Sequence, residues 1–401
     1  MVERSADVTN SYLRSSRLRL VSSLGFMLLG LLVGIFRLMN LHGIRVYPSF
    51  LIPLYEVHPN IMVFGFLAPI IMSERYAGIS ILNLQKSTIL ASRLMVPLTQ
   101  AGLLLQIAGD LAGIFYFALI GSFLIFAGLL CFIFLMFILS KKTGIRLPFY
   151  FMILSIFPLE AYAILTYRSG FISNAPEAVM LLLFPAIFIF GERIELTRYS
   201  TAGYSESKFR LGFYGCILLF ILTLAATVSS SDSSWLMASA FTIMIIVAAL
   251  ILTDESSNFK RNIKSKFPLQ RYVMANVAVA YFWLITASVF GIYFFAFSSG
   301  NAYDAMIHAM AVGFIGTMLL AHGPVILPSL LKRRSPLNPS LMPLVILTLS
   351  NSLRISGDFF YNGYFAIVSG ISGWLILIAV LLFVRTIFFS SSSGKQQVQR
   401  G

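Results

Sequence analysis

Long apolar runs separated by short polar segments make up nearly the whole chain. Most runs contain about 20 residues, the length that an α-helix needs to cross roughly 30 Å of hydrocarbon. Backbone polar groups cannot remain unpaired in lipid, so spans of this length are expected to be helical. The pattern predicts an all-α, polytopic membrane helix bundle of about twelve spans, at residues 20–41, 56–73, 88–109, 111–140, 147–167, 176–191, 211–230, 235–253, 271–296, 304–330, 341–357 and 363–389.

Composition and charge support this fold class and orient it. The chain is 58% hydrophobic and only 11% charged, too few charges for a soluble chain of 401 residues. If the N-terminus is cytoplasmic, all but four of the 29 Lys and Arg residues fall in inner segments, as the positive-inside rule requires. We therefore expect both termini to be cytoplasmic, in the cell membrane, with the net charge of +14 facing anionic lipid rather than nucleic acid. The four outer exceptions are Arg37, Arg45, Arg168 and Arg354.

The domain organisation is expected to be simple. Residues 1–19 are polar and basic and read as a cytoplasmic segment without a cleavable signal, so that span one is the insertion signal. Residues 20–389 form one transmembrane domain whose main partner is the lipid bilayer, and the Ser/Gln-rich residues 390–401 form a disordered cytoplasmic tail. Neither Cys131 nor Cys216 has a metal-type spacing, and both are expected to be buried apolar residues.

Two of the four histidines lie at matched depth. His58 is near the outer end of span two and His308 near the outer end of span ten, and both spans run from outside to inside. Two imidazoles in this arrangement could bind the two faces of one haem iron. Met62 and Gly65 follow His58 at i+4 and i+7, on the same helical face. The alternative is that both histidines cap helix starts or line a water-filled vestibule.

The other two histidines are weaker candidates for metal ligands. His322 lies 14 residues beyond His308, about 21 Å along a helix. That spacing would suit two stacked haems, but the inner half of the membrane offers no partner histidine, so a second haem is not expected. Pro324 is expected to break the helix beside His322 instead. His42 ends span one and is either a third outer ligand or an interfacial residue.

Three arginines cluster near the outer face: Arg37, Arg45 and Arg354. An arginine presents the bidentate fork that suits the propionate carboxylates of a haem. The same positions are also explained by snorkelling of the side chains to lipid headgroups.

Other polar residues within the spans favour a different function. Glu160 in span five is an intramembrane carboxylate, which is a functional candidate by default. Arg93 begins span three, and Gln100 and Gln106 follow along that span, where they form either a polar track or interhelical hydrogen bonds. A haem-free secondary transporter or permease, with these residues along its path, is therefore the main alternative. A structural anchor subunit of a respiratory complex is a third hypothesis.

Three stretches of the sequence resemble the NnrS family, twelve-span membrane proteins that contain haem and copper and are linked to nitric oxide metabolism. "HPNIMVFGF" (58–66) resembles the family's span-two signature, and it is also similar to the H-x-x-x-M helix of the low-spin haem in subunit I of haem–copper oxidases. "HAMAVGFIGTMLLA" (308–321) resembles the family's H-A-x-x-V-G-x-I-G-x-M helix, and "LRISGD" (353–358) a short arginine-containing element. The resemblance implies that His58 and His308 are the axial ligands of one haem b, in a protein of electron transfer or of nitric oxide or small-gas redox chemistry.

The departures from that pattern limit what is carried over. The family's H-x-H is His58-Pro59-Asn60 here, and "VILPSLLKRR" replaces its Gly-His-Thr-Gly-Arg element. Copper and oxygen reduction are therefore not expected. Whether the chain turns over a substrate stays open, as do redox partner subunits.

Overall fold

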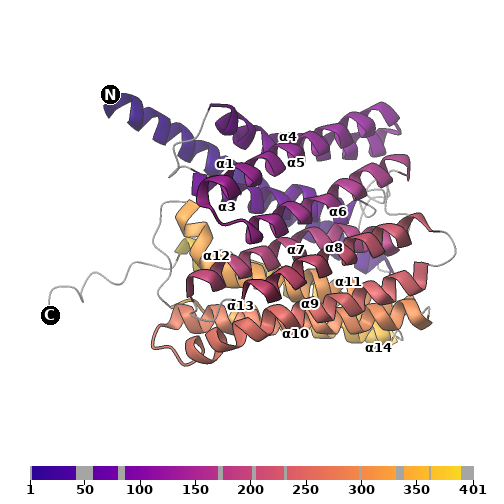
Figure 1. Cartoon of the computed structure of the whole chain (residues 1–401). Helices are drawn as coiled ribbons and strands as arrows, with labels where there is room; N and C mark the ends of the chain where they lie inside the picture. The colour runs from indigo at the N-terminus through magenta and orange to yellow at the C-terminus, as the bar shows by residue number, and fades with distance from the viewer. Residues whose placement is uncertain are drawn as a thin grey trace.

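The described part of the chain is entirely helical in its regular elements. The computed structural model describes residues 2–41, 57–79, 86–169, 175–200, 205–229, 233–297, 300–330, 338–360 and 363–389, and no strand occurs in these ranges. The helices lie side by side along roughly one direction (Figure 1). In order they are α1 Val2–Leu41, α2 His58–Asn60, the π-helix η2 Ile61–Leu67, α3 Ala68–Ile79, α4 Lys86–Ala112, α5 Phe115–Thr143, α6 Leu147–Ser169, α7 Ala175–Ser200, α8 Glu206–Val228, α9 Ser233–Asn262, α10 Pro268–Phe297, α11 Gly300–His308, the π-helix η3 Ala309–Gly316, α12 Thr317–Leu330, α13 Met342–Phe359 and α14 Gly363–Phe389.

The chain is a multi-pass membrane protein. Large apolar side chains lie on its outside, among them Phe123 at 68% exposed and Trp235 at 80%, an arrangement that suits lipid and not water. Among the described residues, nine helical stretches are long and apolar enough to cross a membrane. They are Arg17–Asn40, Thr88–Ala112, Phe115–Thr143, Leu147–Leu165, Glu206–Val228, Ser233–Thr253, Pro268–Phe297, Ala302–Pro328 and Ile367–Ile387.

The other three expected spans are also helices. Residues 56–73 correspond to α2, η2 and α3, residues 176–191 to α7, and residues 341–357 to α13. α7 is buried at every position from Pro176 to Ile194, because neighbouring helices surround it. A helix shielded from lipid in this way can carry charged residues that a lipid-facing helix cannot.

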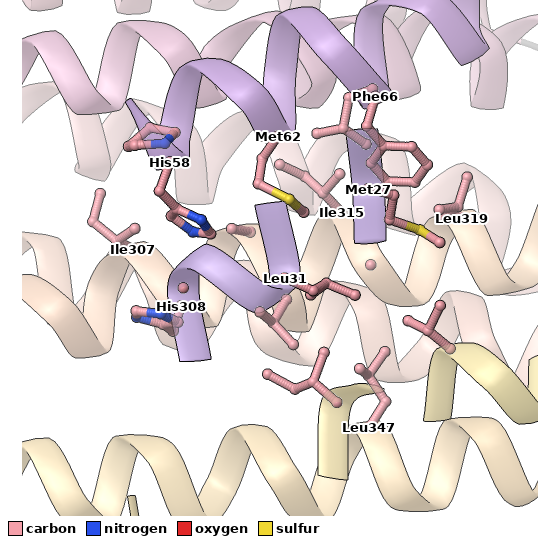
Figure 2. Close-up of a pocket in the computed structure, with 18 of the residues that line it drawn as sticks. Met27, Leu31, His58, Met62, Phe66, Ile307, His308, Ile315, Leu319 and Leu347 are labelled. Carbon is pink, nitrogen blue, oxygen red and sulfur yellow. The ribbon is translucent and has the colours of Figure 1, made fainter. Parts of the chain in front are cut away.

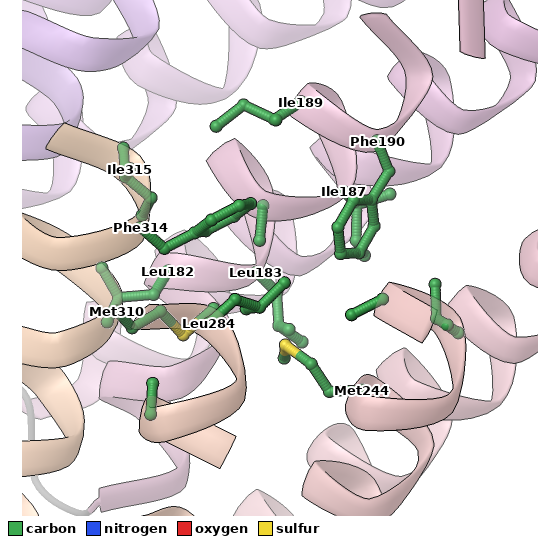
Figure 3. Close-up of a cluster of buried hydrophobic side chains, with 14 of the residues drawn as sticks. Leu182, Leu183, Ile187, Ile189, Phe190, Met244, Leu284, Met310, Phe314 and Ile315 are labelled. Atoms are coloured by element: carbon green, nitrogen blue, oxygen red, sulfur yellow. The ribbon is translucent and has the colours of Figure 1, made fainter. Parts of the chain in front are cut away.

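Helices adjacent in sequence pack as antiparallel pairs, with α7 in the centre. The close pairs include α4 with α5, α6 with α7, α8 with α9, and α13 with α14. In the central cluster, Leu183 and Phe190 of α7 meet Met244 of α9, Leu284 of α10 and Phe314 of η3 (Figure 3). These five side chains are apolar, so dispersion contacts between tightly packed side chains hold these helices together here.

Small residues allow the backbones of α4 and α5 to approach each other closely. A Cβ on Gly102 would lie 2.5 Å from the carbonyl oxygen of Gly121, and Gly128 is equally close to Thr99. The turn between the two helices contains Gly113 at φ 65°, a left-handed conformation that glycine adopts without strain. Gln106 donates a hydrogen bond to Ser122 across this pair, and Gln100 donates to the carbonyl of Gly65 in η2. The span-three amides are therefore interhelical hydrogen-bonding groups.

Ion pairs and one histidine–carboxylate contact join four helices that are far apart in sequence. Arg75 of α3 contacts Glu192 of α7 at 2.8 Å, Arg193 pairs with Glu255 of α9, and the ring of His322 of α12 lies 4.0 Å from Glu192. These four helices consequently end at the same face of the bundle. His58 and His308 lie at the beginnings of two of the same helical segments, so they belong to the opposite end.

Candidate functional site: a cavity lined by two histidines

His58 and His308 lie at equivalent places in two helices. His58 begins α2, three residues before η2, and His308 ends α11 immediately before η3. Both π-segments contain a glycine on which an aromatic ring packs: Phe26 against Gly65 and Trp283 against Gly313. π-turns inside α-helices are rare and occur frequently at functional sites. Two of them, each beginning within three residues after a histidine, single out this end of the bundle.

Backbone carbonyls fix the tautomer of both rings. The Nδ1 of His58 lies 2.8 Å from the carbonyl oxygen of Gly30, and the Nδ1 of His308 lies 2.8 Å from that of Asp304. A carbonyl oxygen only accepts hydrogen bonds, so each Nδ1 must carry the proton. In the neutral ring the lone pair is then on Nε2. Metal-binding histidines commonly have this arrangement, with the other ring nitrogen donating to a carbonyl.

Two glycines of α1 let the segment that begins at His58 pack closely, Gly34 against the His58 ring and Gly30 against Met62. A Cβ on Gly34 would lie 2.8 Å from Cε1 of His58, and one on Gly30 would lie 2.5 Å from the sulfur of Met62. Gly30 also supplies the carbonyl that holds the ring. The "GLLVG" spacing of residues 30–34 is a small-xxx-small pattern, the signal in the sequence that would have identified this contact.

Both histidines line one large cavity. Its volume is about 1010 Å³, and α1, η2, η3, α12, α13 and α14 contribute to its wall. In Figure 2 the two histidines lie at one end of the cavity, and Met27, Phe66 and Leu319 at the other. The polar lining comes mainly from the histidine end, while the rest is aliphatic and aromatic. The cavity therefore suits a large, mostly apolar ligand that has a polar or metal-containing head.

A charged cluster adjoins His308 at the same end. Arg354 of α13 contacts Asp304 at 2.9 Å and Asp358 at 3.2 Å, and it donates to the hydroxyl of Ser369. Ligand atoms of Asp304, His308 and Asp358 all lie within 4.8 Å of one another, the one such trio in the described residues. The guanidinium already supplies positive charge between the two carboxylates, so a metal ion there would have to displace Arg354.

The remaining outer candidates differ in their surroundings. Arg37 lines the cavity and is exposed, so it can reach a carboxylate at the cavity mouth, whereas all three nitrogens of Arg354 already face protein oxygens. Met62 lines the cavity. Gly65 packs under Phe26 and does not line it, because the wider turn of η2 rotates the residues that follow Met62. His42 and Arg45 lie outside the described residues.

Asn60 occupies the place of the second histidine in the H-x-H pattern, and its side chain joins α2 to α6 by a hydrogen bond. Its side-chain oxygen accepts a hydrogen bond from the hydroxyl of Tyr162 on α6, and both side chains are buried. Asn60 does not line the cavity. This position therefore offers no ligand to a metal beside His58.

The structure does not bring the transporter candidates together. Arg93 is on an exposed face of α4, and its backbone carbonyl accepts a hydrogen bond from Arg19. Glu160 of α6 is 6% exposed, and neither carboxyl oxygen has a hydrogen-bond partner within the described part of the chain. Neither residue lines the large cavity. His322 faces Arg193 and Glu192, which account for its position without a metal.

Glu160→Gln is expected to change stability little, by less than about 1 kcal/mol. No cation or donor offsets a charge on this buried carboxyl group, so we expect it to be uncharged, like the amide that would replace it. Glu255→Gln is the comparison, because it removes a charge that is paired with Arg193. Unfolding of both variants in detergent tests this. A loss of several kcal/mol in Glu160→Gln would show that the carboxylate is ionised and has a partner.

Comparisons with known proteins place the chain in a family without assigning it a role. No curated protein and no solved structure matches the sequence. A family profile described as a domain of unknown function, DUF8744, matches residues 17–392, which include every described residue that lines the cavity. The chain therefore belongs to the DUF8744 family of proteins.

Proposed function

We propose that the chain is a membrane-embedded b-type haem protein in which His58 and His308 are the two axial ligands. In this proposal it crosses the cell membrane twelve times, with both termini cytoplasmic and the haem near the outer face. The nine apolar spans, together with the helices α2–α3, α7 and α13, supply the twelve crossings. The distribution of Lys and Arg along the sequence supports the orientation.

One observation carries the proposal. Two histidines from distant parts of the sequence line the same cavity, and each has its Nδ1 proton held by a backbone carbonyl. This leaves Nε2 of both rings as a lone-pair donor in a largely apolar space of about 1010 Å³. Interfacial histidines that only cap helices would need neither the cavity nor a glycine, Gly34, against the His58 ring.

The residues around the cavity favour electron transfer. A haem that is bound supplies one-electron chemistry, and two permanent histidine ligands leave no position for a substrate on the iron. A role in nitric oxide or small-gas chemistry would require one histidine to dissociate from the iron, so that the gas could bind in its place. Arg37 is placed to pair with a propionate, whereas Arg354 fixes Asp304 and thereby the carbonyl that holds His308. The electron would come from or pass to other redox subunits.

The test is a reduced-minus-oxidised absorption spectrum of the purified protein, expressed with adequate haem supply. We expect a Soret band and resolved α and β bands that are typical of low-spin iron with two histidines. A colourless protein would overturn the proposal. In that case, dependence of solute uptake on Glu160 would favour a transporter, and copurification with cytochrome subunits would favour an anchor.

Gly34→Ala is expected to weaken haem retention roughly 10- to 100-fold, the usual effect of disturbing a group that orients a metal ligand. The added Cβ would lie 2.8 Å from the His58 ring, which the carbonyl of Gly30 prevents from turning aside. Gly25→Ala is the matched control on α1, because no atom lies within 4 Å of its added Cβ. Haem content per protein after dilution measures the effect. Equal retention in both variants would show that the ring position does not matter.

A further inference from the structure

The large cavity continues far beyond the two histidines. Along α14 its lining runs from Ser372 to Ile387, about 22 Å of helix. Its far part is lined by side chains of α1, η2, α3, α12 and α14, among them Met27, Phe66, Leu319, Leu327, Phe383 and Ile387. Three of these residues, Met27, Phe66 and Leu319, are seen opposite the histidines in Figure 2. We call this part of the cavity the inner arm.

The inner arm is apolar throughout its described lining. The polar side chains on the cavity wall are at the histidine end, and besides the two histidines they are Arg37, Tyr303, Asp304, Arg354 and Ser372. The wall of the arm itself is tightly packed, since Gly323 of α12 lies directly against the ring of Phe383. An apolar cavity does not hold ordered water, and empty volume inside a packed protein costs stability. The inner arm is therefore expected to contain an apolar ligand.

A haem held by the two histidines does not fill the inner arm. In the proposed arrangement the flat macrocycle is centred between the rings of His58 and His308. Leu319 already lies at the opposite end of the close-up in Figure 2, and Leu327 is about 12 Å further along α12. A rigid ring centred on the histidines ends before this region. The inner arm consequently has room for a second ligand.

The length and position of the inner arm fit one lipid chain. The distance of about 12 Å from Leu319 to Leu327 is close to half the thickness of the hydrocarbon layer, roughly 15 Å, which is the depth that a chain of one leaflet fills. The helices α1 and α14, which form part of the wall, also face lipid: Leu29 is 41% exposed and Leu381 is 51% exposed. Lipid chains therefore lie directly outside the wall of the arm.

Positive charge lies at the end of the inner arm that is remote from the histidines. Leu20 of α1 and Ile387 of α14 belong to one packed cluster there. Arg17 is one helical turn before Leu20, Arg385 is two residues before Ile387, and both arginines are exposed. A guanidinium group binds a phosphate through two parallel hydrogen bonds. This end of the arm thus suits a ligand with an anionic head.

We propose that the inner arm binds one acyl chain of an anionic phospholipid, whose phosphate lies at Arg17 and Arg385. In the orientation proposed above, this lipid belongs to the cytoplasmic leaflet, which is rich in anionic heads. A quinone fits less well, because the described lining of the arm offers no hydrogen-bond donor to its ring oxygens. The bound lipid joins α1 to α14, the first and last helices of the bundle. The proposal does not rest on the haem.

The test is native mass spectrometry of the full-length protein released from nanodiscs that contain dioleoyl phosphatidylglycerol and dioleoyl phosphatidylcholine in equal amounts. The two lipids have the same chains and differ in the charge of the head. We expect the protein to retain one phosphatidylglycerol. Val380→Trp should lose it, because the indole ring would fill the inner arm. Leu381→Trp, on the lipid face of the same helix, should keep it. Arg17→Gln with Arg385→Gln should lose the preference for phosphatidylglycerol.

Other outcomes overturn the proposal. A parent protein that retains no lipid has no such site, and equal retention in both tryptophan variants would place the lipid on the outer surface. A quinone retained in place of a phospholipid by protein purified directly from cells would identify a different ligand. If Val380→Trp does not fold, the double arginine variant decides, because both of its positions are exposed. An unchanged preference for phosphatidylglycerol then contradicts the site. Haem content, measured on the same samples, separates this result from the haem proposal, and nanodiscs with the same lipids in both leaflets make it independent of the orientation.

Discussion

His58→Ala and His308→Ala proteins will each be purified without the low-spin b-type spectrum expected of the parent chain. Each substitution removes one of the two proposed axial ligands, and the described residues that line the cavity include no further histidine to replace it. Disturbing a group that merely orients a ligand costs roughly 10- to 100-fold in affinity, so losing the ligand itself should cost at least as much. The measurement is the haem-to-protein ratio together with the reduced-minus-oxidised spectrum.

The matched control for these variants is His322→Ala. It removes a buried histidine from the same run of helix as His308, but one that faces Arg193 and Glu192 at the other end of the bundle. It should therefore keep the full spectrum. Misfolding is separated from ligand loss by His58→Gly and His308→Gly with added imidazole, which should restore the band. Full retention of the spectrum in both alanine variants would refute the ligand assignment.

The sequence was sufficient to single out the two histidines, because depth in a membrane follows from topology. Once the apolar runs and the distribution of Lys and Arg set the direction of each span, His58 and His308 fall at the same level. The structure places both on one cavity. The predicted helical character of the chain is confirmed in the described residues. It could be predicted because a span of about 20 residues that crosses lipid can pair its backbone polar groups only as a helix.

Contacts that depend on the rotation and packing of helices could not be predicted in this way. Gly65 was expected on the His58 face from a period of 3.6 residues per turn, and the π-turn of η2 removes it from the cavity. Gly34, which the pattern of polar residues does not mark, takes the place beside the ring.

The buried ion pairs of Arg75 and Arg193 could not be predicted from the sequence, because the partners are far apart along the chain. Arg75 and Glu192 are separated by 117 residues, and Arg193 and Glu255 by 62. The positive-inside count treats both arginines as interchangeable cytoplasmic charges. Only the packing of α7 between its neighbours turns them into specific partners of Glu192 and Glu255.

Arg193→Met is expected to destabilise the protein by about 3–5 kcal/mol, the usual cost of breaking a buried ion pair. Arg193 and Glu255 have side chains that are only 5% and 4% exposed, and the substitution leaves the Glu255 carboxylate buried without its cation. Glu255→Leu should cost a similar amount, because it leaves the buried guanidinium without its paired carboxylate. Unfolding in mixed micelles, titrated with a denaturing detergent, gives the free energies.

The double substitution distinguishes two contributions to the free energy of unfolding. One is the cost of leaving a single buried charge without its partner, and the other is the net contribution of the ion pair itself. Replacing a buried pair by apolar residues of similar volume is often neutral or stabilising, since neither charge then has to be desolvated. Arg193→Met with Glu255→Leu should therefore recover most of the loss, giving a coupling energy of several kcal/mol in a double-mutant cycle. The exposed pair Arg210–Glu206, with side chains 64% and 56% exposed, should show less than about 1 kcal/mol in the same cycle. A double variant as unstable as the sum of its singles would mean that Arg193 and Glu255 act through Tyr281 and His322 instead of through each other.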